Sequence, residues 1–402
     1  MTAPRGRIRP LVGRIGLTGL TLAIAAVAAA PASAAYPGHN GALAFTSTQD
    51  GGARHIFLPT TAGLRDLTGA SSPADETQPR FSPDGREILF TRQAPGLHNS
   101  EIFVMSANGA GRTQLTNTAQ PNSDATWSPD GTRIAFVSGR AHGEADIFVM
   151  NSDGTDVTEI THDAAAKSEL AWSPQGNRIA FVREPAGGGD RDIYSITPNG
   201  GGLVDLTNDP QSDDVEPAYS PDGNFIAYSG AGHPNRESVA GDLWIMGADG
   251  SAIHPLPHES NGYSDGAYPA WSPDGGTIAF AANDGSGYYH VWSVPSAGGQ
   301  NTELVQNPVP GGNPDDEEVD WGPAPTSGRA RTEITGASLG SRHRATFRFH
   351  ATGPATGYRC LIHSAGHARR FTRCHSPRAY VGLKPGRYSF EVTAFGPGER
   401  YR

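Results

Sequence analysis

Short apolar runs of three or four residues recur along most of the chain, and residues typical of turns separate them. One set of runs comprises Ile88–Phe90, Ile134–Phe136, Ile179–Phe181, Ile226–Tyr228 and Ile278–Phe280. A second set follows after a loop and comprises Ile102–Met105, Ile147–Met150, Ile193–Ile196, Leu243–Met246 and Val291–Val294. Runs this short, rich in β-branched and aromatic residues, predict strands rather than helices.

A turn motif precedes each run of the first set. It reads aromatic-Ser-Pro-Asp-Gly, with Gln for Asp in one copy, and its five copies are Phe81–Gly85, Trp127–Gly131, Trp172–Gly176, Tyr219–Gly223 and Trp271–Gly275. The aromatic residues lie 46, 45, 47 and 52 positions apart. Pro presets the second position of such a turn, and Gly tolerates the conformation that closes it. We therefore interpret the Ser and Asp residues of the motif as turn-forming rather than catalytic.

Four short strands in each period of this length predict the blade of a β-propeller. The first and last units are incomplete, because Gly41–Phe45 lacks a first strand before it and Val319–Trp321 is a first strand with nothing after it. Pairing these two segments would complete a sixth blade and remove two exposed strand edges. The sequence therefore predicts an all-β fold, with a six-bladed propeller over residues 35–323 that closes by strand pairing between its two ends.

The repeats over residues 36–323 resemble the PD40, or WD40-like, repeat of TolB-type propellers, which is named for this Trp-Ser-Pro-Asp-Gly pattern. The resemblance implies the propeller fold. TolB itself joins its propeller to an N-terminal α/β domain and binds an outer-membrane lipoprotein, whereas here the repeats begin directly after residue 35. Prolyl-oligopeptidase-type enzymes also use such propellers, but their Gly-x-Ser-x-Gly hydrolase domain has no counterpart in the remaining residues.

The first 34 residues predict an export signal. Arg5, Arg7, Arg9 and Arg14 precede or border an apolar run over 15–30, and the small-residue site at 32–34 follows it. No later segment approaches 18 consecutive apolar residues, so we expect no transmembrane span after cleavage. The predicted location is outside the cytoplasm, in the periplasm, the cell wall or the medium.

Charge is distributed unevenly along the chain. The total of −10 divides into +4 for residues 1–34, −25 for residues 35–328 and +11 for residues 329–402. An acidic propeller is thus followed by a basic C-terminal region. We expect the basic region to contact an anionic surface such as a cell-wall polymer or the propeller itself, or to be an Arg-rich solvated surface; no motif for sequence-specific nucleic-acid binding is present.

Two sets of carboxylates precede the repeat aromatics and should face the central channel, on the side of the longer loops. Six positions before the aromatic lie Asp75, Asp213, Asp265 and Asp315, and three positions before it lie Asp124, Glu169, Glu216 and Glu318. The first set gives the candidate metal ligands and the second the candidate binding face. Convergent carboxylates favour a cation such as Ca²⁺ or a cationic ligand group. The competing interpretation is that each Asp caps a local turn.

The C-terminal residues 329–402 predict a small second domain after a linker over 324–328. Alternating patterns around 345–350 and 388–394 predict half-buried strands, and the whole resembles the small Ig-like repeats of actinobacterial secreted proteins. The only two cysteines, Cys360 and Cys374, predict a disulfide in an exported protein. A metal site with the neighbouring His363, His367 and His375 is the alternative.

These features favour a non-enzymatic binding or scaffold protein, exported and monomeric, whose acidic loop face binds a protein, a cell-envelope glycan or a cation. No catalytic residue is assigned, and no cofactor is expected beyond Ca²⁺. The alternative is an extracellular hydrolase or lyase that acts on carbohydrate or peptide with carboxylates at the channel mouth.

Overall fold

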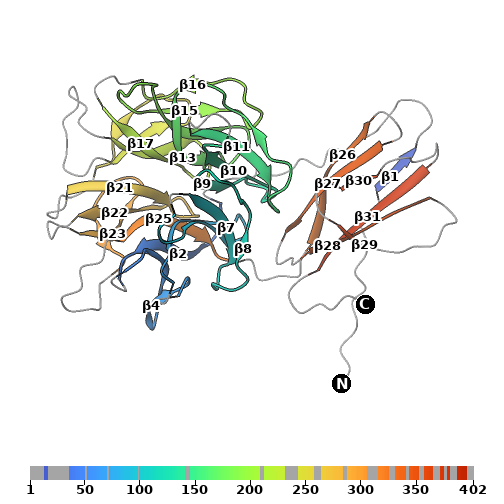
Figure 1. Cartoon of the computed structure of the whole chain (residues 1–402), viewed down its shortest axis with the longest axis horizontal. Helices are drawn as coiled ribbons and strands as arrows, with labels where there is room; N and C mark the ends of the chain where they lie inside the picture. Colours follow the sequence, from blue (N-terminus) through green and yellow to red (C-terminus); the bar gives the residue numbers. More distant parts are fainter. Residues whose placement is uncertain are drawn as a thin grey trace. The chain divides into compact units, whose positions relative to one another are not determined.

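The computed structural model describes residues 13–16, 36–49, 52–69, 72–97, 99–140, 145–208, 212–230, 243–257, 264–283, 288–305, 316–325, 331–340, 344–352, 357–364, 372–374, 378–380 and 387–395. All regular elements among them are β-strands (Figure 1). No helix in these ranges is long and apolar enough to cross a membrane. The chain divides into two compact units, residues 31–324 and residues 1–30 with 325–402, which we describe separately.

Residues 31–324 form six four-stranded antiparallel sheets, one for each blade. The six-bladed all-β propeller that the repeats predict is therefore confirmed. The first blade joins β25 (Asp316–Pro323) to β2 (Asn40–Ser47), β3 (His55–Thr60) and β4 (Gly63–Asp66). The second blade is β5 (Asp75–Phe81), β6 (Glu87–Gln93), β7 (Ser100–Ser106) and β8 (Thr113–Gln114), and the third is β9 (Asn122–Trp127), β10 (Arg133–Ser138), β11 (Asp146–Asn151) and β12 (Thr158–Glu159). The fourth blade is β13 (Ala166–Trp172), β14 (Ile179–Glu184), β15 (Asp192–Ile196) and β16 (Val204–Asp205), the fifth is β17 (Asp214–Tyr219), β18 (Phe225–Gly230), β19 (Leu243–Gly247) and β20 (His254–Pro255), and the sixth is β21 (Ser264–Trp271), β22 (Thr277–Asn283), β23 (Tyr289–Pro295) and β24 (Thr302–Glu303).

The ring closes as predicted, because β25 pairs antiparallel with β2. Leu43 lies opposite Trp321 and Ala44 opposite Asp320. The approach is close at Gly41, where an added Cβ atom would lie 2.5 Å from backbone atoms of Pro323 and Ala324. A blade made from both ends of the propeller leaves neither end as an open sheet edge.

The hydrophobic core lies between neighbouring blades. In one cluster, Val137 and Ile147 of the third blade pack with Trp172 and Phe181 of the fourth. The repeat tryptophans belong to this packing, and the indole N–H of Trp271 also donates to the carbonyl of Ala218 in the preceding blade at 3.1 Å. Their location agrees with a structural role in packing between blades.

The Ser-Pro-Asp-Gly turns are held by their own polar groups. In the first copy, the Ser82 hydroxyl donates to Asp84 at 2.7 Å and accepts from the backbone N–H of Glu87 at 2.9 Å. The copy at Ser272 repeats both bonds, with Asp274 and Thr277. These bonds agree with the turn-forming interpretation of the motif. We call the end of the propeller that carries these turns the turn face.

The second unit contains two sheets, with strand orders β26-β27-β30 and β1-β31-β28-β29. The strands are β1 (Gly13–Gly16), β26 (Arg331–Gly340), β27 (Arg344–Thr352), β28 (Gly357–Ser364), β29 (Thr372–Cys374), β30 (Arg378–Tyr380) and β31 (Arg387–Phe395). Phe347 and Phe390 stack with their ring centroids 3.9 Å apart. The Ig-like assignment of this unit stays a prediction.

The two cysteines lie on paired strands of this unit. Cys360 of β28 is buried and lies opposite Thr372, and Cys374 of β29 lies opposite Tyr358. The disulfide stays a prediction, as does the export signal. β1, which pairs with β31, belongs to the segment assigned to that signal.

Candidate functional site

The innermost strand of every blade carries a bulge three residues before the aromatic residue of the repeat. The six bulge residues have positive φ angles between 51° and 58° although none is glycine: Gln78, Asp124, Glu169, Glu216, Tyr268 and Glu318. The left-handed conformation costs a non-glycine residue of order 1 kcal/mol or more, so it persists only where surrounding contacts enforce it. We call these six residues the channel ring, since all of them line one central cavity.

Side chains of the channel ring bond to the backbone of the next blade and so enforce the bulges. The Glu318 carboxylate accepts the N–H of Gln78 at 2.7 Å, and the Gln78 amide oxygen accepts the N–H of Asp124 at 3.0 Å. Asp124 likewise accepts from the N–H of Glu169. A bulge removes its N–H from the strand ladder, and the neighbouring side chain satisfies it.

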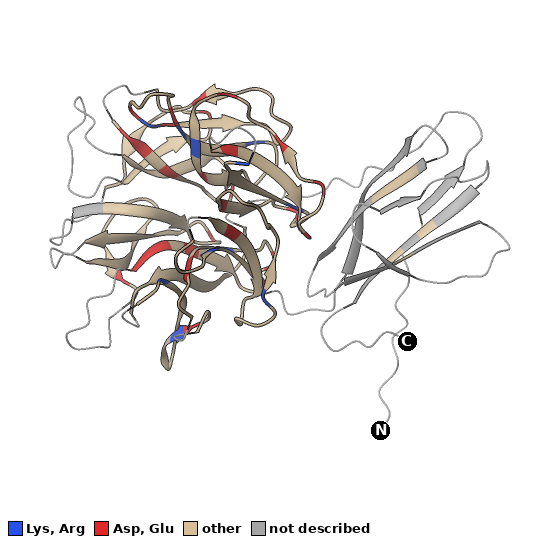
Figure 2. Cartoon of the chain, in the orientation of Figure 1, with Lys and Arg blue, Asp and Glu red and all other residues tan. Residues whose placement is uncertain are grey.

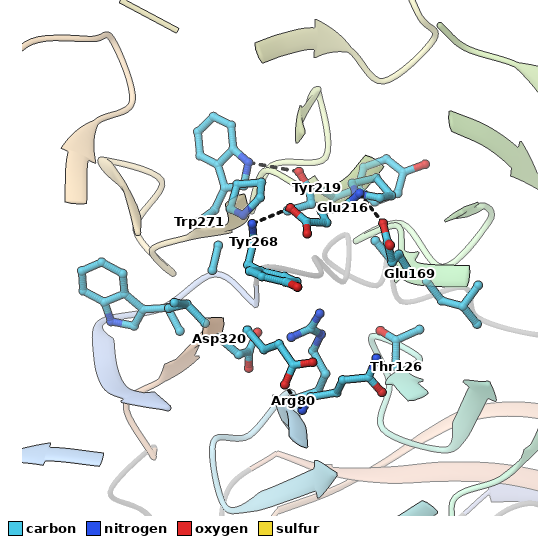
Figure 3. Close-up of a pocket in the computed structure, with 18 of the residues that line it drawn as sticks. Arg80, Thr126, Glu169, Glu216, Tyr219, Tyr268, Trp271 and Asp320 are labelled. Carbon is cyan, nitrogen blue, oxygen red and sulfur yellow. Dashed lines mark hydrogen bonds between the residues drawn. The ribbon is translucent and has the colours of Figure 1, made fainter. Parts of the chain in front are cut away.

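The same series continues through the other half of the ring. Glu169 accepts the N–H of Glu216 at 2.6 Å, and Glu216 accepts the N–H of Tyr268 at 2.6 Å (Figure 3). Tyr268 interrupts the series, because its side chain carries no carboxylate or amide oxygen. The ring is thus a chain of five inter-blade bonds with an aromatic residue at the sixth position.

A second tier lies two residues further along each innermost strand. Three of its members are alanines, and the two charged members, Arg80 and Asp320, belong to adjacent blades. The Asp320 carboxylate accepts the N–H of Phe81 at 2.7 Å. In Figure 3 the Arg80 side chain extends toward the centre, between Glu169, Glu216, Tyr268 and Asp320.

The cavity enclosed by both tiers has a volume of about 120 Å³. Five carboxylates line it, together with one cation, Arg80; the acidic residues are Asp124, Glu169, Glu216, Glu318 and Asp320. Tyr36 lines the cavity at the turn face, where its hydroxyl donates to the backbone carbonyl of Trp127 at 3.3 Å. A small cationic group or a few water molecules would fill this volume.

Burial raises the pKa of four of these acids. Burial, with smaller contributions from the charges of Glu216 and Asp124, raises the pKa of Glu169 to about 8. Burial also raises the pKa of Asp320 to about 6, although Arg80 and the Phe81 N–H act in the opposite direction. The pKa values of Asp124 and Glu216 are raised for the same first reason, desolvation. Negative charge in the cavity is therefore unfavourable until a cation compensates it.

Of the two predicted sets, the structure brings Asp124, Glu169, Glu216 and Glu318 together around the cavity. In the other set, Asp75 and Asp213 accept backbone N–H groups of Arg54 and Arg191 at 2.9 and 2.8 Å. Asp213 also pairs with the Arg191 guanidinium at 2.9 Å. These two contacts are of the capping type. Asp315 and the side chain of Asp265 lie outside the described residues, so metal binding by this set stays a prediction. Across the described residues, no three His, Cys, Asp or Glu side chains are grouped so as to hold a metal ion.

Sequence reasoning missed Gln78, Tyr268, Arg80, Asp320 and Tyr36. Gln78 and Tyr268 are not acidic, although they lie three positions before the repeat aromatic, as the four acids do. Arg80 and Asp320 lie one position before that aromatic, in a column that is otherwise small or polar. No pattern marks Tyr36, because it precedes the repeats.

Comparison with known proteins supports the fold. Residues 26–188 match the family described as TolB beta propeller domain, PD40. TolB from Acinetobacter baumannii is 17% identical with a TM-score of 0.55, over 70% of this chain and 67% of that one. A putative TolB from Agrobacterium tumefaciens is 20% identical with a TM-score of 0.50, over 70% of this chain and 99% of that one.

Two curated relatives match shorter stretches. An uncharacterized peptidase of Bacillus subtilis, YuxL, is 24% identical over 188 residues, which is 44% of this chain and 26% of the relative. Dipeptidyl-peptidase 5 of Porphyromonas gingivalis is 34% identical over 62 residues, which is 14% of this chain and 9% of the relative. The alignments thus span about a quarter or less of either relative. Taken with the sheet order, these findings show that residues 36–323 form a six-bladed β-propeller similar to that of TolB, of which residues 26–188 match the PD40 family.

Proposed function

We propose that this protein is a non-enzymatic binding protein whose propeller channel receives a cationic group, such as the side chain of a Lys or Arg residue of a partner protein. The observation that carries the proposal is the cavity itself, in which five carboxylates face a single arginine. Because burial raises the pKa values of Glu169 and Asp320, part of this charge is neutralised by protons when no ligand is bound. A cation would replace those protons.

Proton release distinguishes this binding from general attraction to an acidic surface. We would titrate the chelator-treated full-length protein with methylguanidinium and, separately, with Ca²⁺ at pH 7 by calorimetry, in two buffers of different ionisation enthalpy. A binding heat that depends on the buffer reports the released protons. Glu169→Gln should reduce the dependence strongly, because Glu169 has the higher pKa of the two acids, while Glu184→Gln, at an exposed end of β14, should preserve it. If neither cation binds the wild-type protein, the proposal is wrong.

An enzymatic role is the second candidate. Two buried carboxyl groups with different raised pKa values, Glu169 at about 8 and Asp320 at about 6, are the kind of pair that can divide acid and base roles. Incubation with oligosaccharide and peptide substrates, followed by mass spectrometry, would test it. If the wild-type protein cleaves a substrate and Glu169→Gln does not, the enzymatic role would be correct and the binding proposal wrong.

Export of the protein belongs to the same proposal. Its support is the basic and apolar N-terminal segment with a small-residue site at 32–34, together with a cysteine pair suited to an oxidising compartment. N-terminal sequencing of protein recovered from the medium or envelope of a producing cell should begin at residue 35. Recovery only from the cytoplasm, with the first residues intact, would contradict export.

A further inference from the structure

A second hollow, of about 790 Å³, opens on the turn face beside the channel. It lies between the β17–β20 and β21–β24 blades, and it is lined by their turns at 220–222 and 273–275 and by Pro37 and Gly38 of the segment that precedes β2. This volume is within the range of small-ligand and peptide-anchor pockets. It is separate from the acidic channel cavity, although Trp271 lines both.

The floor of this hollow is apolar. Phe225, at the start of β18, is 44% exposed and lines it, and Ile245 and Trp271 are buried beneath. Large apolar side chains this exposed are few among the described residues, and the others with this exposure do not line the hollow. An exposed aromatic residue in the floor of an apolar hollow is typical of a surface that receives a partner's anchor residue.

The rim of the hollow is negatively charged. Hydrogen bonds from Ser220 and the Asn224 backbone hold the pKa of Asp222 below its ordinary value against the effect of burial, and the Ser272 hydroxyl does the same for Asp274. Both acids are therefore ionised at neutral pH. Among the described residues that line the hollow, none is Lys or Arg. This charge favours a partner segment with basic residues next to its apolar anchor.

The protein's own chain shows how an extended segment binds on this face. The N–H of Gly38 donates to the carbonyl of Pro273 at 3.1 Å. The Asn40 amide donates to the Asp274 carboxylate at 2.9 Å, and its oxygen accepts the N–H of Asp274 at 3.1 Å. The backbone and carboxylate of a Ser-Pro-Asp-Gly turn thus bind an adjacent peptide directly. The corresponding turn at 220–223 borders the hollow on its other side.

We propose that this hollow binds an extended peptide segment of a partner protein, with a proline or aromatic side chain against Phe225 and a Lys or Arg residue beside Asp222. The apolar floor supplies the affinity, and the two carboxylates select basic flanks. Pro37 and Gly38 form one wall of the hollow.

The test uses a phage-displayed library of random peptides selected on the full-length protein. Selected peptides should combine proline or aromatic residues with Lys or Arg. Phe225→Ser should weaken their binding about tenfold or more, a loss typical of a central anchor contact. The matched control is Leu97→Ser, because Leu97 is 51% exposed in the β6–β7 loop and does not line the hollow.

A second pair of variants tests the charge. Asp222→Asn should weaken binding of the basic peptides several-fold at low salt, whereas Asp249→Asn, in the exposed β19–β20 turn, should leave it unchanged. Unchanged melting temperatures would show that all variants are folded. The proposal is overturned if no peptide is selected, if the selected peptides are acidic, or if they bind Phe225→Ser as well as they bind Leu97→Ser.

Discussion

At the scale of single residues, the channel ring shows how a strained conformation is stabilised by a neighbour. Glu216 adopts a left-handed conformation, its N–H is bonded by Glu169, and its own carboxylate accepts from Tyr268 and from the Ser229 hydroxyl at 2.7 Å. The same carboxylates that could bind a ligand therefore also hold the bulges in place. Replacement by an amide removes the charge and keeps one acceptor oxygen, while the other oxygen becomes an NH₂ donor.

Glu169→Gln should stabilise the protein increasingly as pH rises. Burial favours the neutral form of Glu169 and raises its pKa to about 8, so the folded protein binds a proton more tightly than the unfolded chain does. The free energy of unfolding of the wild-type protein therefore falls as pH rises from the pKa of Glu169 in the unfolded chain toward 8. The total loss is up to roughly a few kcal/mol. Melting temperatures of both proteins at pH 5 and pH 8 measure the effect.

The control for this prediction is Glu184→Gln, whose side chain is exposed. Its melting temperature should differ from that of the wild-type protein by the same small amount at both pH values. An equal difference for Glu169→Gln at pH 5 and pH 8 would show that Glu169 does not titrate in this interval.

At the scale of elements, β25 has two roles. It supplies the innermost strand that closes the first blade, and it carries Glu318 and Asp320 into the cavity. Closure depends on the close approach of β2 and β25 near Gly41 and Pro323, where no side chain fits between the strands. Closure of the ring and formation of the candidate site are therefore one structural event.

Gly41→Val should destabilise the whole propeller. Its Cβ atom would lie 2.5 Å from backbone atoms of Pro323 and Ala324, so the strands would have to separate. Overpacking of this kind costs about 1–3 kcal/mol, and we expect the melting temperature to fall by several degrees in a single transition. Differential scanning calorimetry measures both features.

Gly52→Val is the matched control, because nothing lies within 4 Å of a Cβ atom added at Gly52. It should melt within about a degree of the wild-type protein, as most surface substitutions do. If Gly41→Val melts like Gly52→Val, the close strand approach does not contribute to closure.

At the scale of the whole molecule, the propeller concentrates acidic charge. Residues 35–328 carry −25, and Figure 2 shows acidic residues on blades all around the ring. Net charge of this size destabilises a compact state through self-repulsion and attracts basic partners. Both proposed sites, the channel and the turn-face hollow, use the same sign of charge.

Salt should therefore raise the melting temperature of the chelator-treated protein. Screening shortens the range of repulsion from about 30 Å at 0.01 M to about 8 Å at 0.15 M ionic strength, and we expect a rise of a few degrees. Choline chloride should act like sodium chloride, because the effect depends on ionic strength alone. A rise with sodium only would indicate a bound ion, and no rise at all would contradict the importance of self-repulsion.

The sequence by itself determined the architecture, because each turn motif constrains its own backbone and the strand pattern repeats at a fixed interval. The sequence was sufficient to predict six blades and the pairing of the segments at Leu43 and Trp321. The first unit lacks a first strand, and the strand at Trp321 lacks the rest of a blade, so each completes the other. It also singled out Asp124, Glu169, Glu216 and Glu318, because equivalent positions in a ring must converge.

Only the tertiary structure decided what surrounds these acids. Gln78 and Tyr268 join the ring because rotation about the propeller axis relates equivalent positions of the six innermost strands. All six positions therefore face the cavity, whatever residue occupies them. Arg80 and Asp320 become neighbours only on closure, since 240 positions separate them along the chain. The pKa of Glu169 depends on burial among residues of other blades, which no local pattern records.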